Sequence, residues 1–228
     1  MVRMRDEFRP QNPAFEAREH KLGQPDVVVI REHRAVVEFA RSLSTIFNPF
    51  ICATALFVIV ARAFSSSTFH FWELSIAGLF FFTIAPMLCV FYLYLSGRIG
   101  DFDMSDRLER SRAFIALVIV YASAALFLMV VRAPTVLVAI TWGYVGATVA
   151  IMIVTRWWKI STHAFGVTGP FAVMFLLFGL QPLPYVAIVP LVCWARCYLR
   201  AHSVAQVLAG VALAVVSTLA VFRLFHLV

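Results

Sequence analysis

Residues 113–131 read AFIALVIVYASAALFLMVV, a run without a single charged side chain. About 20 apolar residues are enough for a helix to cross the hydrocarbon core of a bilayer. Similar blocks cover 46–64, 74–96, 134–155, 164–180, 184–200 and 203–226. Backbone groups in lipid must be hydrogen-bonded within their own segment, so each block is predicted to be a helix. The sequence therefore predicts an all-α, polytopic integral membrane helix bundle with six or seven transmembrane helices.

The overall composition supports this class. Hydrophobic residues make up 62% of the chain and charged residues only 14%, whereas a soluble domain is about half apolar and a quarter charged. Two blocks, 164–180 and 184–200, are short for a full span, and Pro182 and Pro184 mark a turn between them. This is why the predicted count is six or seven. The domains expected are a charged, cytosolic or interfacial segment over 1–45 and a membrane-embedded domain over 46–228.

The basic residues gather on one side of the predicted bundle. With seven helices, the segments 1–45, 97–112, 156–163 and 196–203 fall on the same side and hold eight, four, two and two Lys or Arg residues. The other side holds Arg62, Arg132 and Arg223. Loops rich in Lys and Arg stay in the cytoplasm. We expect a bacterial-type inner or plasma membrane, with the polar face in the cytoplasm. The net charge of +7 follows from this bias, and nucleic acid is not an expected partner.

Nearly all carboxylates outside the N-terminal segment lie in one loop. Asp101, Asp103, Asp106 and Glu109 occur there, and no acidic residue follows Glu109. Arginines share the loop and can hold phosphate oxygens in fork geometry, while carboxylates can hold a divalent cation beside a phosphate. A solvated loop with local ion pairs, or an acidic cap on the next helix, is the alternative interpretation.

Two histidines lie at predicted helix ends on the side of the bundle that holds most of the Lys and Arg residues. The sequence around each of them resembles a signature of a known family. Residues 195–210 read ARCYLRAHSVAQVLAG, in which Arg196 is followed by five residues, His202, three residues and Gln206. Upstream stands KISTH over 159–163, which ends in His163. These stretches resemble the third and second signatures of the type 2 phosphatidic acid phosphatase family. The stretch from Asp103 to Ser111 is a weaker match to its first signature, with Arg110 at the arginine position.

The resemblance implies a membrane hydrolase that cleaves a lipid phosphate or isoprenoid diphosphate through a phosphohistidine. It implies that His202 is the nucleophile, that His163 is the general acid, and that Arg110, Arg196 and Ser161 bind phosphate. From charge and proximity we add Lys159 and Arg107 to the phosphate-binding set. The partners expected are this substrate and membrane lipid, with no cofactor. The chemistry is coherent on its own terms, because phosphoryl transfer needs cations on the phosphate oxygens and an in-line nucleophile, and an imidazole can attack or donate a proton near neutral pH.

Three positions depart from the family pattern. Gln206 stands where the family has an aspartate, Asp103 replaces a lysine and Ser111 replaces a proline. An amide oxygen can hold the His202 ring but gives no charge-assisted bond, so we expect weakened catalysis. One alternative is a magnesium-assisted prenyl diphosphate cyclase or transferase, with the metal on Asp101, Asp103 and Asp106. Another is a non-catalytic membrane protein that binds lipid phosphates.

Overall fold

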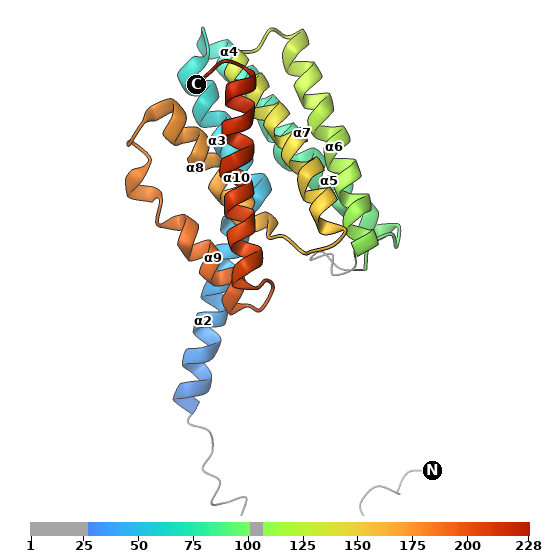
Figure 1. Ribbon diagram of the computed structural model, residues 1–228, viewed down its shortest axis with the longest axis vertical. Helices are drawn as coiled ribbons and strands as arrows, with labels where there is room; N and C mark the ends of the chain where they lie inside the picture. The colour runs from blue at the N-terminus through green and yellow to red at the C-terminus, as the bar shows by residue number, and fades with distance from the viewer. Residues whose placement is uncertain (1–26, 101–106) are drawn as a thin grey trace, which may run out of the picture. The chain divides into compact units, whose positions relative to one another are not determined.

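The computed structural model describes the backbone of residues 27–100 and 107–228, and the side chains of residues 34–100 and 109–228. Throughout these residues the regular structure is helical (Figure 1). The chain divides into two compact units, Met1–Phe39 and Ala40–Val228. Helix α2 covers Val27–Ile46, and the second unit contains all the helices that follow it. The predicted all-α class is therefore confirmed for the described part of the chain.

The helices of the second unit follow the apolar blocks of the sequence. They are α3 (Pro49–Phe64), α4 (Thr68–Leu79), the π-helix η1 (Phe80–Ile84), α5 (Ala85–Leu95), α6 (Arg107–Val130), α7 (Thr135–Thr155), α8 (Thr162–Phe178), the 3-10 helix η2 (Leu183–Tyr185), α9 (Ile188–Tyr198) and α10 (Val204–Leu224). α4 begins at Thr68, before the start of the apolar block 74–96. It begins there because the Ser67 hydroxyl accepts a hydrogen bond from the His70 N–H and caps the helix.

Within the residues that the structure describes, four helices are long and apolar enough to cross a membrane: Thr68–Leu95, Glu109–Val130, Thr135–Thr155 and Val204–Leu224. A fifth is added if Arg34–Ile46 and Pro49–Phe64, which are joined by a bend, form one broken span. Six or seven spans are not confirmed by helix length. The reason is that α8 has 17 residues and α9 has 11, whereas a straight span needs about 20. The helices are consistent with an integral membrane protein.

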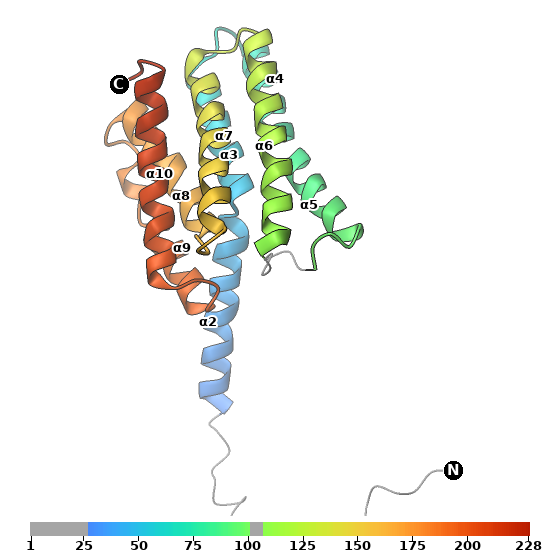
Figure 2. The ribbon, with the colours of Figure 1, turned by 45° about the vertical axis from the view of Figure 1, so that its right-hand side comes forward.

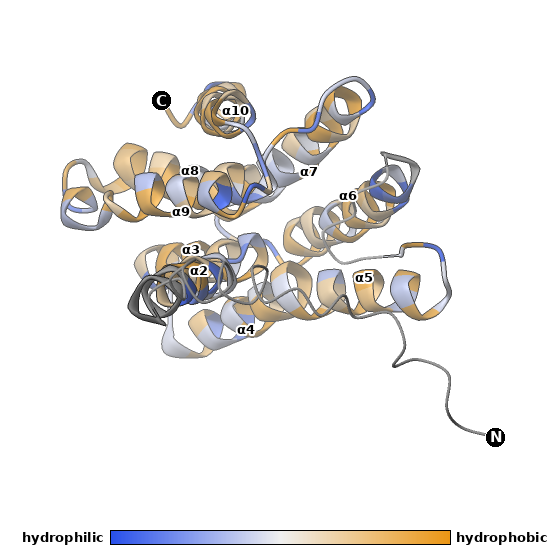
Figure 3. Ribbon diagram, turned by 90° about the horizontal axis from the view of Figure 1, so that it is seen from below, coloured by the Kyte–Doolittle hydropathy of each residue, from blue (hydrophilic) through white to orange (hydrophobic). Residues whose placement is uncertain are grey.

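The helices pack around one large core. α6 packs mainly on α7, α10 on α8 and α7, and α3 on α8 and α4 (Figure 2). Phe57, Phe82, Leu128, Leu137 and Phe222 are fully buried within this core. Large hydrophobic side chains also lie exposed on the outer surfaces of α3, α4, α5, α6, α7, α9 and α10, and these helices are mostly hydrophobic along their length (Figure 3). Exposed apolar side chains in such number are the composition that a lipid environment favours.

The start of α6, the end of α7, the start of α8 and the α9–α10 turn lie at the same end of the second unit (Figure 2). The C-terminus lies at the other end. Residues that are far apart in sequence, near positions 110, 160 and 200, therefore meet at one end.

Candidate active site

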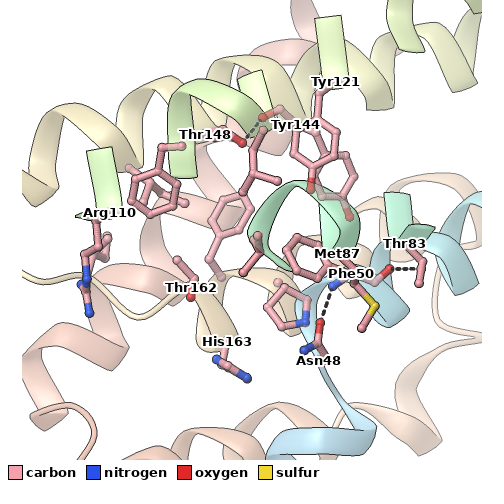
Figure 4. Close-up of a pocket in the computed structure, with 18 of the residues that line it drawn as sticks. Asn48, Phe50, Thr83, Met87, Arg110, Tyr121, Tyr144, Thr148, Thr162 and His163 are labelled. Atoms are coloured by element: carbon pink, nitrogen blue, oxygen red, sulfur yellow. Dashed lines mark hydrogen bonds between the residues drawn. The ribbon is translucent and has the colours of Figure 1, made fainter. Parts of the chain in front are cut away.

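A cavity of about 690 Å³ opens among these helix ends. Five of its lining residues are basic or carry imidazole: Arg110, Lys159, His163, Arg196 and His202. Among the described residues that line it, none is acidic. The rest of the wall is mainly apolar and comes from α3, η1, α5, α6, α7 and α8. The cavity thus joins a cationic region to a long apolar region, and Figure 4 shows Arg110 and His163 on its wall.

Arg110 lies in the first turn of α6 and its side chain is 7% exposed. The residues beside it tie this helix to the chain before position 101. Glu109 accepts a hydrogen bond from the Gly100 N–H at 3.0 Å, and the Arg112 guanidinium donates to the Arg98 carbonyl at 3.0 Å. Glu109 also places a negative charge at the helix N-terminus, where the helix dipole favours it. These contacts hold the first turn of α6, and with it Arg110, at the cavity.

His163 is fixed by the N-terminus of α8. Ser161 is the N-cap residue, and its hydroxyl accepts from the Ala164 N–H at 3.3 Å. The Ser161 N–H donates in turn to the Gln206 carbonyl at 3.2 Å. The first turn of α8 is therefore joined through the backbone to the first turn of α10. His163, on α8, and His202, next to α10, are positioned by one connected unit.

The turn between α9 and α10 brings Arg196 and His202 together. The Ala201 N–H donates to the Arg196 carbonyl at 3.1 Å and the Arg200 N–H to the Cys197 carbonyl at 2.9 Å. This is the Schellman pattern of a helix C-terminus. It requires a left-handed residue after the cap, and Arg200 has φ 53°. Because the turn is so tight, the His202 N–H also reaches the Arg196 carbonyl, at 3.3 Å.

Gln206 fixes the tautomer of His202. The Gln206 Oε1 atom accepts from the Ser203 N–H at 3.1 Å and lies 3.2 Å from His202 Nδ1. Since a backbone N–H can only donate, the side-chain atom between them must be the amide oxygen. The oxygen can only accept, so Nδ1 must carry the proton. In the neutral ring the lone pair then lies on Nε2, the atom that is free to act as a nucleophile.

The surroundings of His202 also favour the neutral ring. The pKa of His202 is lowered from the usual 6.5 to about 4, first by burial and next by the charge of Arg196. Lys159 and Arg110 act in the same direction, while the hydrogen bond to Gln206 raises the pKa. A cationic imidazolium would repel the three neighbouring cations. His202 is therefore neutral near pH 7, with its lone pair available.

The structure brings most of the predicted site residues together. Arg110, Lys159, His163, Arg196 and His202 line the cavity, and Gln206 contacts the His202 ring as the sequence spacing predicts. Ser161 is fully buried behind the wall as a helix cap.

Four predicted residues lie outside the described side chains. They are Asp101, Asp103, Asp106 and Arg107. The magnesium site that the alternative interpretation places on the three aspartates therefore stays a prediction.

The apolar region of the cavity contains polar residues that the sequence interpretation missed. Tyr121, Tyr144 and Thr148 line it from α6 and α7, and Asn48 and Thr83 line it from the other side. Tyrosines in the middle of apolar blocks were the available signal, since polar groups inside a membrane helix usually face the protein interior.

No protein-family model matches the chain, and neither a curated protein nor a solved structure matches it. The functional argument therefore rests on the residues and geometry of the site itself.

Proposed function

We propose that this protein is a membrane phosphatase that hydrolyses a lipid phosphate or an isoprenoid diphosphate through a phosphohistidine intermediate. The observation that carries the proposal is one cavity lined by two imidazoles and three cations, with no carboxylate among its described lining residues. An anion with a long apolar tail fits both regions of such a cavity. Cations there would bind phosphate oxygens and stabilise the charge that is redistributed during phosphoryl transfer.

The reaction would proceed in two steps. The Nε2 lone pair of His202 attacks phosphorus, an N–P bond forms, and the bond from phosphorus to the lipid oxygen breaks. His163 gives its proton to that leaving oxygen, so the lipid departs as an alcohol, or as a monophosphate if the substrate is a diphosphate. Water then attacks phosphorus, His163 takes a proton from it, and the N–P bond breaks to release inorganic phosphate. Arg110, Lys159 and Arg196 hold the phosphate oxygens in both steps.

Gln206 acts through His202 and is a positioning residue. Its amide oxygen keeps the proton on Nδ1 and so presents Nε2 to phosphorus. When Nε2 forms its bond, the ring becomes cationic, and a neutral amide stabilises that charge less than a carboxylate would. This accounts for the slow catalysis that we expect of the protein.

We also infer that the site lies at the cytoplasmic surface of the membrane and that the chain crosses the membrane seven times. The Lys and Arg residues at the site end support this orientation. Trp157 and Trp158, 71% and 40% exposed, stand directly before Lys159. Exposed tryptophans are typical of the membrane–water interface, which is the depth that a lipid headgroup occupies. Crossing by α8 and α9 would need local thinning of the bilayer around these short helices.

The test is phosphate release from a panel of lipid monophosphates and isoprenoid diphosphates, with and without a magnesium chelator. The proposal predicts release that survives chelation and is lost in His202→Ala. A reaction that stops on chelation, and that releases inorganic diphosphate in place of inorganic phosphate, would indicate metal-assisted prenyl diphosphate chemistry. Binding of lipid phosphates without any release would indicate a non-catalytic binding protein.

A further inference from the structure

Asn48 precedes α3 and lines the same cavity as the two histidines. It is the N-cap residue of that helix, and its Oδ1 atom accepts a hydrogen bond from the Phe50 N–H at 2.9 Å. Because a backbone N–H can only donate, the side-chain atom that caps the helix must be the amide oxygen. The orientation of the amide is therefore fixed, and the N–H groups of Nδ2 point away from the helix cap.

The Nδ2 amide of Asn48 is a donor that a ligand can use. Among the residues that the structure describes, none accepts a hydrogen bond from it. Asn48 is half-buried, and Nδ2 is not one of the polar atoms that the protein closes off. Figure 4 shows this nitrogen on the side of Asn48 that is turned toward His163. An oxygen atom of a ligand that lies beside His163 can accept this hydrogen bond.

Close packing between the start of α3 and α8 holds Asn48 next to His163. A Cβ atom at Gly166 would lie 2.6 Å from the Pro49 Cβ and 2.8 Å from the Pro49 Cα, so the two backbones touch there. His163 stands three residues before Gly166 on α8, which places it about one helical turn, or about 5 Å, away on the same face. Asn48 directly precedes Pro49. The amide and the imidazole therefore flank one part of the cavity, where its cationic region meets its apolar region.

This part of the cavity is the leaving-group side of the proposed reaction. His163 gives its proton to the oxygen that leaves phosphorus, while Arg110, Lys159 and Arg196 hold the phosphate that is attacked. In an alkyl monophosphate the leaving oxygen is attached to carbon, and the tail beyond it offers no acceptor. In a lipid diphosphate the leaving oxygen belongs to a second phosphate, which brings charged oxygens directly beside it.

We propose that Asn48 binds this second phosphate through Nδ2, and that the protein therefore prefers lipid diphosphates to lipid monophosphates. The inference rests on the proposed function, which sets the direction of the substrate in the cavity. An amide donates to the charged oxygens without adding a cation beside His163, and a cation there would disfavour the protonated imidazole that the reaction needs. Asn48 is thus a specificity-determining residue as well as a helix cap.

The test compares dodecyl phosphate with dodecyl diphosphate, which have the same tail and differ only in the second phosphate. Dissociation constants are measured on His202→Ala, where turnover does not interfere, with and without Asn48→Ser. Serine keeps a hydroxyl that can cap α3 and removes the amide. We expect the dissociation constant of the diphosphate to rise about ten-fold or more, as the loss of a hydrogen bond to a charged group does. That of the monophosphate should change by less than about two-fold.

Ser67→Ala in the same background is the control. It removes the cap of α4 at a residue outside the cavity lining, and it should change neither dissociation constant. Retained binding of the monophosphate shows that the Asn48→Ser protein is folded.

An equal change for the two ligands in Asn48→Ser would overturn the proposal and leave Asn48 as a helix cap alone. Unchanged binding of the diphosphate, or a diphosphate that binds His202→Ala no more tightly than the monophosphate, would overturn it too. Phosphate release from the two ligands by the wild-type protein tests the proposed function separately. If neither is hydrolysed, the proposed function fails, while the dissociation constants still decide the role of Asn48.

Discussion

Gly210 of α10 lies against the backbone of Ser161 at the start of α8. A Cβ atom at Gly210 would lie 2.5 Å from the Ser161 carbonyl oxygen and 3.2 Å from the Ala164 Cβ. This contact lies one helical turn from the hydrogen bond between the Ser161 N–H and the Gln206 carbonyl. The two helices that position His163 and His202 therefore meet where only glycine fits.

Gly210→Ala should push α8 and α10 apart and reduce the rate of phosphate release. Overpacking of this kind costs about 1–3 kcal/mol of stability. We expect at least a ten-fold loss of kcat/KM, because displacement of reacting groups by about 1 Å can cost a hundred-fold. Gly146→Ala, also in a helix but with open space at its Cβ, is the control and should keep full activity. Equal activity of the two variants would show that the close contact does not position the histidines.

Replacing Gln206 by a carboxylate should raise phosphatase activity. Gln206→Asp gives the charge-assisted bond to His202 but is one methylene shorter than glutamine. Gln206→Glu keeps the reach of 3.2 Å to Nδ1 and the capping contact to the Ser203 N–H. We expect the glutamate variant to release phosphate about ten-fold faster or more, and the aspartate variant to show a smaller increase in rate. Steady-state phosphate release measures this, and a loss of activity in the correctly folded glutamate variant would contradict the role given to position 206.

The acid limb of the pH profile should report His202. Because the pKa of His202 is lowered to about 4, the nucleophile stays neutral as the pH falls through 6.5 and is protonated only near 4. Arg196→Gln removes a charge that lowers this pKa, so the acid limb of kcat/KM should move to higher pH. The maximal value of kcat/KM should fall as well. Comparing the two proteins on one substrate cancels the ionisation of the substrate itself. An acid limb at the same pH in both would contradict the electrostatic account.

Arg200 should be replaceable by glycine with a gain in stability. Its left-handed φ of 53° closes the turn after α9, and such a conformation costs a non-glycine residue about 1 kcal/mol. Arg200→Ala removes the same charge but keeps the strain, which makes it the matched control. We expect the free energy of unfolding of Arg200→Gly to exceed that of Arg200→Ala by about 1 kcal/mol. Thermal unfolding should show this as a higher midpoint temperature for the glycine variant. A less stable glycine variant would show that the turn is held by the arginine side chain.

The sequence predicted the helices and the convergence of the polar residues for clear physical reasons. Apolar runs must become helices in lipid, and alternating helix ends bring Arg110, His163 and His202 to one face. The spacing of four residues also predicted the contact of Gln206 with the His202 ring.

Other features depend on packing that sequence patterns do not encode. The cluster of the Phe82, Tyr121 and Tyr144 rings joins η1, α6 and α7, which are distant in sequence. The span count could not be read from hydropathy, because blocks as apolar as 164–180 end as helices shorter than a bilayer. Ser161 was predicted to bind phosphate, and only the structure shows its hydroxyl engaged as the cap of α8.

The central claim is that His202 forms a covalent bond to phosphorus. The most direct measurement is to incubate the protein with a radiolabelled lipid phosphate, denature it rapidly, and locate protein-bound phosphate by peptide mapping. We expect acid-labile label on the peptide that contains His202, absent in His202→Ala and retained in His70→Ala, whose histidine lies outside the cavity lining. Label that persists in His202→Ala, or continued phosphate release by that variant, would contradict the account.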